Sequence, residues 1–328
     1  MALIVPTGYA SIPPDADSRP NLAWVFPGQG SQAVGMGRDL YERFDAARDI
    51  FDAADRELGF SLSRLCFEGP EEELLNTVNT QPAIVTTSIA CFAAAYGRLD
   101  IVDGAPAYVA GHSLGEYSAL IAAGVIPFAE GVRLVRERGR LMQEAGERNP
   151  GTLAAIMGLD DSIVEEVCQE TGAEICNING AGQIVIGGPR DAVLLAMDLA
   201  KARGAARVIQ PNVSGAFHSS LMRPAADGMR RALLDANLLD PRIPIIGNCD
   251  GVPLESARAL KDELARQVAT AVQWQRSVEY MVRAGVSTFV EIGPGRVLSS
   301  LIKRIARGVS VRAVGDAAAI EGDAAGSA

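Results

Sequence analysis

Residues 107 to 124 read AYVAGHSLGEYSALIAAG: an apolar stretch, a glycine-flanked turn at 111–115 and a second apolar stretch. This pattern predicts a buried strand, a sharp turn and a helix. The turn has the form G-x-S-x-G, in which small neighbours let the serine adopt a strained backbone conformation at the helix N-terminus, where backbone N–H groups favour negative charge. Ser113 is therefore a candidate nucleophile.

A purely structural role for Ser113 is the alternative. Glu116 lies three residues further on, so the two side chains could form a capping box at the start of the helix. A cap requires neither Gly111 nor Gly115, whereas a nucleophile elbow uses both. The two glycines favour the catalytic interpretation.

A serine hydroxyl is a weak nucleophile near neutral pH and needs a base within hydrogen-bond reach. The sequence contains 2 histidines. His112 directly precedes Ser113, and adjacent side chains diverge at a sharp turn, so we expect His112 to shape the turn. His218 lies in a polar loop before a helix expected to begin near Ser219, and a helix N-terminus would keep its imidazole neutral. His218 is the predicted base.

Arg138 occupies an unusual place on the helix expected from about Ala129 to Ala145. It shares a helix face with apolar residues three, four or seven positions away, namely Leu134, Val135, Leu141, Met142 and Ala145. A buried guanidinium without an anion is costly. The spacing leaves two partners open for Arg138, an internal Asp or Glu and a carboxylate of the substrate.

Residues 22 to 32, LAWVFPGQGSQ, indicate a buried strand that ends in a glycine turn. The turn lacks the features of a phosphate loop, because no Gly-Lys-Ser/Thr follows and Ala33 stands where a dinucleotide-binding fingerprint has its third glycine. What remains is a loop with exposed backbone N–H groups, and the oxyanion formed from an ester or thioester needs two of these.

With these features in view, the chain resembles the malonyl-CoA:acyl carrier protein transacylases and the related acyltransferase domains of polyketide synthases. The resemblance covers residues 22–312, with several motifs in the same order. These motifs are FPGQGSQ (26–32), TQPAI (80–84), GHSLGEYSAL (111–120), RGRLMQEA (138–145), NINGAGQIVIGG (177–188), VSGAFHSSLM (213–222), VQW (272–274) and EIGPGRVL (291–298).

The resemblance implies a role for each principal site residue. Ser113 would carry the acyl group, His218 would act as base and later as acid, and Arg138 would hold the malonyl carboxylate. The backbone N–H groups of Gln29 and Leu114 would form the oxyanion hole.

Three further residues follow from the same resemblance. Gln267 would orient His218 through its backbone carbonyl, so that serine and histidine work without an acidic third member. Gln81 and Phe217 would bind the substrate, and the aromatic ring of Phe217 is typical of malonyl-using members because it disfavours an α-methyl branch. Gly215 departs from the polyketide version of this motif, which makes the Phe217 signal less specific.

Strands expected near 22–26, 106–110, 244–248 and 286–292 alternate with helical stretches and predict a largely parallel sheet. Between 150 and 212 the pattern is β-α-β-β-α-β, the ferredoxin-like plan, which would form one wall of the cleft. We therefore expect an α/β fold with an α/β-hydrolase-like large subdomain and an inserted ferredoxin-like small subdomain. The expected divisions are a flexible extension (1–20), the large subdomain (21–149 and 213–314), the small subdomain (150–212) and a flexible tail (315–328).

Composition narrows the class of protein. The chain has 328 residues, 48% of them hydrophobic, which is enough for one large core and a smaller one. The 5 cysteines show no metal-ligand spacing, so we expect free core cysteines and no metal site. The net charge of −10 argues against nucleic acid, and the apolar run at 83–96 is too short for a membrane span. These features predict a cytoplasmic protein, which we expect to be a monomer.

The predicted activity is ping-pong transfer of a malonyl group from malonyl-CoA to the phosphopantetheine thiol of acyl carrier protein, in fatty acid or polyketide synthesis. Coenzyme A thioester would enter as substrate, and no cofactor would be bound permanently. One alternative is an acyl-thioester hydrolase with the same serine and histidine, although acyltransferase-like hydrolases typically replace the residue equivalent to Arg138. The other is a non-catalytic module that docks carrier protein, against which Ser113 and His218 argue.

Overall fold

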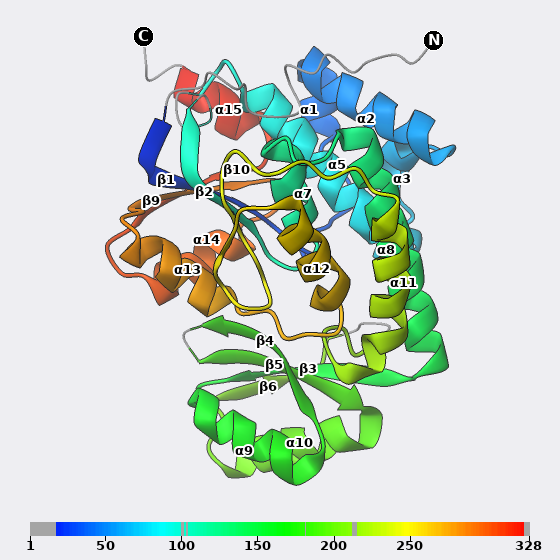
Figure 1. Ribbon diagram of the computed structural model, residues 1–328, viewed down its shortest axis with the longest axis vertical. Helices are drawn as coiled ribbons and strands as arrows, with labels where there is room; N and C mark the ends of the chain where they lie inside the picture. The colour runs from blue at the N-terminus through cyan, green and yellow to red at the C-terminus, as the bar shows by residue number, and fades with distance from the viewer. Residues whose placement is uncertain (1–17, 100–101, 103, 181, 212–214, 325–328) are drawn as a thin grey trace.

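The computed structural model describes residues 18–324 except 100, 101, 103, 181 and 212–214, and its strands form two sheets (Figure 1). The strands are β1 (Ser18–Phe26), β2 (Ala105–Gly111), β3 (Gly151–Met157), β4 (Glu174–Gly180), β5 (Gln183–Pro189), β6 (Arg207–Ile209), β7 (Ile245–Ile246), β8 (Pro253–Leu254), β9 (Thr288–Ile292) and β10 (Ser310–Val314). The helices of the first half are α1 (Arg38–Arg43), α2 (Asp45–Leu58), α3 (Leu62–Glu68), α4 (Glu71–Leu75), α5 (Thr77–Ala95), α7 (Gly115–Ala122) and α8 (Phe128–Arg148). Those of the second half are α9 (Asp161–Thr171), α10 (Arg190–Ala202), the 3-10 turn η1 (Ser220–Met222), α11 (Arg223–Leu234), α12 (Ala257–Gln267), α13 (Trp274–Arg283), α14 (Val297–Ile305) and α15 (Ala317–Ala324).

The larger sheet has the strand order β10-β9-β1-β2-β7-β8, with parallel pairing from β10 to β7 and antiparallel pairing of β7 with β8. Alternate side chains of β1 serve two cores: Trp24 and Phe26 join one, and Ala23 and Val25 join the other. A central parallel strand is buried on both faces in this way because helices cover each side of the sheet. The α/β fold with a parallel sheet is therefore confirmed.

Helix α5 is the central helix on one face of this sheet. Almost all of its residues are buried, and it packs against α2 and α8. Helices α13 and α14 cover the opposite face, where Trp274 and Leu298 join the second core. Parallel strands share one orientation, so the loops at their carboxyl ends gather along one edge of the sheet. The turn after β2 lies at this edge.

The smaller sheet has the order β4-β5-β3-β6, and its neighbouring strands pair antiparallel. Helices α9 and α10 pack on one face of it and share its core (Figure 1). Its elements follow the chain order β-α-β-β-α-β that the sequence predicted. The backbone of β4 also bonds to the large subdomain, since Ile178 N–H donates to Val272 O over 2.8 Å and Val272 N–H donates to Cys176 O over 2.9 Å.

The termini differ from the expected flexible segments. Strand β1 begins at Ser18, so residues 18–20 belong to the sheet, while 1–17 lie outside the described residues. The expectation of a flexible tail at 315–328 is wrong for helix α15. Ala317 and Ile320, three positions apart on that helix, are both 1% exposed. The Ala- and Gly-rich composition of this segment does not indicate the short apolar helix face that the structure shows. Residues 325–328 lie outside the described part.

Two expectations drawn from composition concern the state of the cysteines and the presence of a membrane-spanning helix. The five cysteines are all free and buried, as predicted. No helix in the described ranges is both long and apolar enough to cross a membrane.

Candidate active site

Ser113 lies at the sharp turn between β2 and α7. Its φ angle is 51°, a left-handed conformation that is strained for a residue with a side chain. Gly115 permits this turn, because a Cβ at that position would collide with the carbonyl oxygen of Phe26 in β1. The backbone N–H of Ser113 donates to Asn248 Oδ1 over 2.7 Å.

The capping-box alternative for Ser113 does not match the structure. Helix α7 has no side-chain capping hydrogen bond at its N-terminus. The carboxylate of Glu116 instead accepts hydrogen bonds from the amides of Asn248 and Gln267. Ser113 Oγ is consequently free to face the imidazole of His218.

His218 lies beside Ser113 although 105 residues separate them, and the distance from Ser113 Oγ to His218 Nε2 is 2.7 Å. The other ring nitrogen, Nδ1, is 2.9 Å from the backbone oxygen of Gln267. A carbonyl oxygen only accepts hydrogen bonds, so Nδ1 carries the proton and the Nε2 lone pair faces the serine hydroxyl. This is the orientation that a base for Ser113 requires.

The neutrality of His218 has a different cause from the one predicted. Burial first, and then the Arg138 guanidinium, lower the pKa of His218 from 6.5 to about 3. The predicted helix N-terminus is not the main reason, since the 3-10 turn η1 separates His218 from α11. Desolvation penalises the imidazolium more directly than the helix dipole does.

This low pKa predicts a flat pH profile for the acylation step. A base works in its unprotonated form, so lowering its pKa from 6.5 to about 3 moves the acid limb to lower pH. We expect the rate of Ser113 acylation to stay constant as the pH falls from about 7.5 to about 5.5. Rapid-quench mass spectrometry would measure this rate, with circular dichroism at each pH as the folding control. A loss of rate centred near the ordinary pKa of histidine would contradict the assignment.

Arg138 on α8 is 1% exposed, and its guanidinium points at the same serine. One terminal nitrogen donates to Gln81 Oε1 over 2.8 Å. The other donates to Ser113 Oγ over 3.0 Å and to Gln267 Oε1 over 2.8 Å. Burial lowers the pKa of Arg138, as expected for a cation removed from water.

The partners of Arg138 bear on the choice that the sequence left open. Within the described residues, no carboxylate forms an ion pair with Arg138, and its Nε atom has no hydrogen-bond partner. Amide oxygens hold the guanidinium without neutralising it. A carboxylate arriving with the substrate would supply the missing anion, so the geometry favours that option.

The two predicted oxyanion donors are the backbone N–H groups of Gln29, in the loop after β1, and of Leu114, in the elbow itself. In the described part of the chain, the backbone N–H groups of Gln29 and Leu114 make no hydrogen bond. The loop that carries Gln29 is held against the elbow, because His112 N–H donates to Phe26 O over 3.1 Å. These two N–H groups suit an oxygen that becomes negative next to Ser113.

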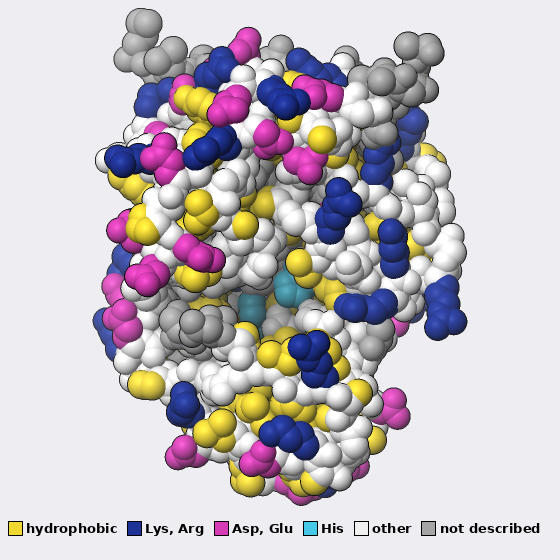
Figure 2. Space-filling model, turned by 180° about the vertical axis from the view of Figure 1, so that it is seen from behind, with side chains coloured by type: hydrophobic (Ala, Val, Ile, Leu, Met, Phe, Trp, Pro, Cys, Tyr) yellow, Lys and Arg dark blue, Asp and Glu magenta, His cyan; other side chains and the backbone are white. Residues whose placement is uncertain are grey.

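A cleft of about 590 Å³ opens above these residues. Ser113, His218, Gln29 and Phe217 line it from the large subdomain, and Val185 is one of several lining residues from the small one. Figure 2 shows the two histidines at the bottom of this hollow. Gln81 is fully buried and contributes through its bond to Arg138, whereas Phe217 lines the cleft directly.

Asn248 is a site residue that the motifs did not indicate. It follows β7 at the carboxyl edge of the large sheet, where its amide contacts Ser113, Gly111 and Glu116. The available signal was a polar residue two positions after a short apolar strand, at the edge where α/β proteins place their sites. In the described part of the chain no group of three or more His, Cys, Asp or Glu could hold a metal ion.

The fold and this convergence of serine, imidazole and guanidinium define the class of serine-dependent acyl-transfer proteins. The sequence model of the acyl transferase domain matches residues 23–320, and the chain belongs to this family.

Relatives and solved structures agree with this assignment. The malonyl CoA-acyl carrier protein transacylase of Bacillus subtilis is 43% identical over 305 residues, which cover 92% of this chain and 95% of that protein. The transacylase of Escherichia coli K12 is also 43% identical, covering 91% of this chain and 97% of that protein.

Two solved structures are similar over most of their length. The acyl-carrier-protein-S-malonyltransferase of Bartonella henselae has a TM-score of 0.88 and 41% identity, covering 92% of this chain and 98% of that one. A malonyl-transacylase solved in complex with its type II polyketide acyl-carrier protein has a TM-score of 0.89 and 41% identity, covering 93% and 99%.

Proposed function

We propose that this protein transfers a malonyl group from malonyl-CoA to the phosphopantetheine thiol of acyl carrier protein, for fatty acid or polyketide synthesis. The observation that carries this proposal is Arg138, a buried cation beside Ser113 whose direct partners are amide and hydroxyl oxygens. A malonyl thioester places a carboxylate two bonds from the reacting carbonyl, so one pocket can hold both groups.

The first half-reaction loads the serine. Ser113 Oγ attacks the thioester carbonyl while its proton passes to His218 Nε2. The oxygen of the tetrahedral intermediate becomes negative and accepts hydrogen bonds from the N–H groups of Gln29 and Leu114. The carbon–sulfur bond then breaks, and His218 returns the proton to the sulfur of the departing coenzyme A.

The second half-reaction repeats these steps with another thiol. The phosphopantetheine thiol of the carrier protein gives its proton to His218 and attacks the malonyl-Ser113 ester. The carbon–oxygen bond breaks, and Ser113 Oγ recovers the proton. Because both half-reactions move only protons and the acyl group, no permanently bound cofactor is required.

Two further properties follow from this proposal. One chain supplies every residue used above, so we expect a monomer to be active. Malonyl-CoA and the carrier protein meet in the cytoplasm, which is where we place the enzyme.

Formation of the acyl-enzyme tests the proposal. After mixing with malonyl-CoA, the intact protein should gain the mass of one malonyl group, and fragmentation should locate it on Ser113. Ser113→Ala removes the nucleophile and should show no gain, because the remaining groups cannot form the ester. A parent protein without the adduct would overturn the proposal, and so would an adduct on another residue.

A further inference from the structure

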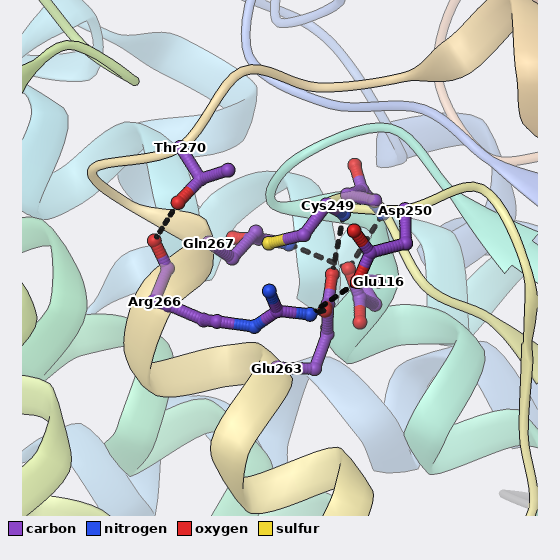
Figure 3. Close-up of polar contacts among 8 residues, drawn as sticks. Glu116, Cys249, Asp250, Glu263, Arg266, Gln267 and Thr270 are labelled. Carbon is purple, nitrogen blue, oxygen red and sulfur yellow. Dashed lines mark hydrogen bonds and ion pairs between the residues drawn. The ribbon is translucent and has the colours of Figure 1, made fainter.

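Glu116 is a fully buried acid, one turn of α7 beyond Ser113. Its Oε2 atom accepts a hydrogen bond from Asn248 Nδ2 over 2.5 Å and one from Gln267 Nε2 over 2.7 Å. Figure 3 shows its carboxylate among the polar side chains that follow β7 and end α12. Burial, and next the charge of Glu263, raise the pKa of Glu116 well above its usual range, so the group is held there at an energetic cost.

The carboxylate determines which way the two amides point. An amide has a donating nitrogen and an accepting oxygen, whereas Glu116 Oε2 offers only an acceptor. Both nitrogens must therefore face Glu116, which turns Asn248 Oδ1 toward the N–H of Ser113 at 2.7 Å. The same constraint turns Gln267 Oε1 toward Arg138 at 2.8 Å.

The remaining amide hydrogens hold the elbow. Asn248 Nδ2 donates to Gly111 O over 2.8 Å, and Gln267 Nε2 donates to Ser113 O over 2.9 Å. Each amide nitrogen thus divides its two hydrogens between Glu116 and the backbone of the elbow. These bonds brace the strained, left-handed backbone of Ser113 from both sides.

Gln267 also keeps the acid and the arginine apart. Its side chain lies between Glu116 and Arg138, accepting from the guanidinium and donating to the carboxylate. The carboxyl group of Glu116 consequently lies near the guanidinium without occupying its donors. The terminal nitrogens of Arg138 stay aimed at Ser113 Oγ, where the substrate carboxylate is proposed to bind.

We propose that Glu116 is a positioning residue for acyl transfer, which fixes the amide orientations of Asn248 and Gln267 and thereby the Ser113 backbone and the direction of Arg138. This inference rests on the proposed malonyl transfer through Ser113. The inference predicts two separable effects. Loss of the hydrogen bonds that hold the Ser113 backbone slows acylation by every acyl donor. Loss of Arg138 alignment slows acylation by malonyl donors in addition.

Glu116→Leu tests the inference, because leucine fills similar space without an acceptor. The rates of Ser113 acylation by malonyl-CoA and by acetyl-CoA are measured by rapid-quench mass spectrometry and normalised to the final adduct. We expect both rates to fall and the malonyl-to-acetyl ratio to fall by about tenfold, the equivalent of one hydrogen bond to a charged group. Glu116→Gln keeps an acceptor oxygen, so its ratio should stay within about threefold of the parent.

Glu291 provides the matched control. It is also fully buried, and its carboxylate accepts from the N–H groups of Leu298 and Ser299 and makes no hydrogen bond to Ser113, Arg138 or His218. We expect Glu291→Leu to lower the melting temperature and leave the malonyl-to-acetyl ratio unchanged. If Glu116→Leu does not fold, Glu116→Asp draws the carboxylate back from both amides and carries the same expectation.

An unchanged ratio in Glu116→Leu would overturn the inference. An equal fall of the malonyl-to-acetyl ratio in Glu116→Gln and Glu116→Leu would also overturn it. A fall of the same size in Glu291→Leu would overturn it as well. The parent protein distinguishes this failure from failure of the proposed function. If the parent forms malonyl-Ser113 while the Glu116 variants keep its ratio, only the positioning role is wrong.

Discussion

Replacement of His218 by alanine should slow the formation of malonyl-Ser113 by about 10³- to 10⁴-fold, the effect of removing a general base together with its alignment. In the parent protein Nε2 lies 2.7 Å from Ser113 Oγ, and the Gln267 carbonyl holds the ring in the accepting tautomer. Without the imidazole, the hydroxyl proton has no acceptor of suitable basicity beside it. Rapid-quench mass spectrometry of the adduct would give the rate.

His112 supplies the control for this prediction. Its Nε2 is 2.8 Å from Asn179 Oδ1, and its ring packs edge-on against Trp274. We expect His112→Ala to lose far less activity than His218→Ala, through disturbance of the turn. Similar losses in both variants would contradict the assignment of His218 as the base.

Replacement of Arg138 by alanine should lower the rate of malonyl loading by about 10²- to 10³-fold, since a buried charge-assisted pair with the substrate carboxylate is lost. The rate of loading from acetyl-CoA should fall much less, because an acetyl group has no carboxylate. The preference for malonyl over acetyl would then largely disappear. Competition between the two donors, read as the masses of the adducts, would measure this preference.

Arg140 is the matched control on the same helix. It is exposed and forms ion pairs with Glu137 and Glu144 on the outer face of α8. Arg140→Ala should keep the parent preference, since surface pairs of this kind contribute little. If Arg138→Ala also kept the preference for malonyl, the proposed role of Arg138 would be wrong.

The serine, histidine and arginine that the structure brings together could be singled out from the sequence because each stands in a short local pattern. The two glycines around Ser113 indicate an elbow, and Arg138 stands out as a cation on an apolar helix face. The scarcity of histidine singles out His218. Local patterns also predicted the β-α-β-β-α-β order of the small sheet, where periodicity changes clearly between strand and helix.

Long-range polar contacts could not be predicted in this way. Glu116 has the spacing of a capping box, yet its partners Asn248 and Gln267 lie 132 and 151 residues away in sequence. Nothing local to Glu116 shows that its carboxylate will be fully buried. The same limit applies to His218: the sequence predicts a neutral imidazole at a helix N-terminus, whereas burial and the approach of Arg138, which lower its pKa, are properties of the folded chain.

The segments near the two termini show a second limit, that of predicting flexibility from composition. Residues 18–20 extend β1 because the neighbouring strand β2 offers pairing partners, with Ser18 opposite Ala105. Helix α15 is stabilised because Ala317 and Ile320 pack in the hydrophobic core. A sequence alone does not show whether a neighbouring surface will accept such a segment.

The fate of isolated malonyl-enzyme tests the central claim most directly. The protein is loaded with malonyl-CoA, freed of excess donor and divided between buffer and buffer containing acyl carrier protein with its phosphopantetheine arm. We predict an adduct that persists in buffer and is discharged by the carrier protein in a single turnover, with the malonyl group recovered on the carrier thiol. Release of free malonate at the same rate in both portions would show a hydrolase and contradict the account.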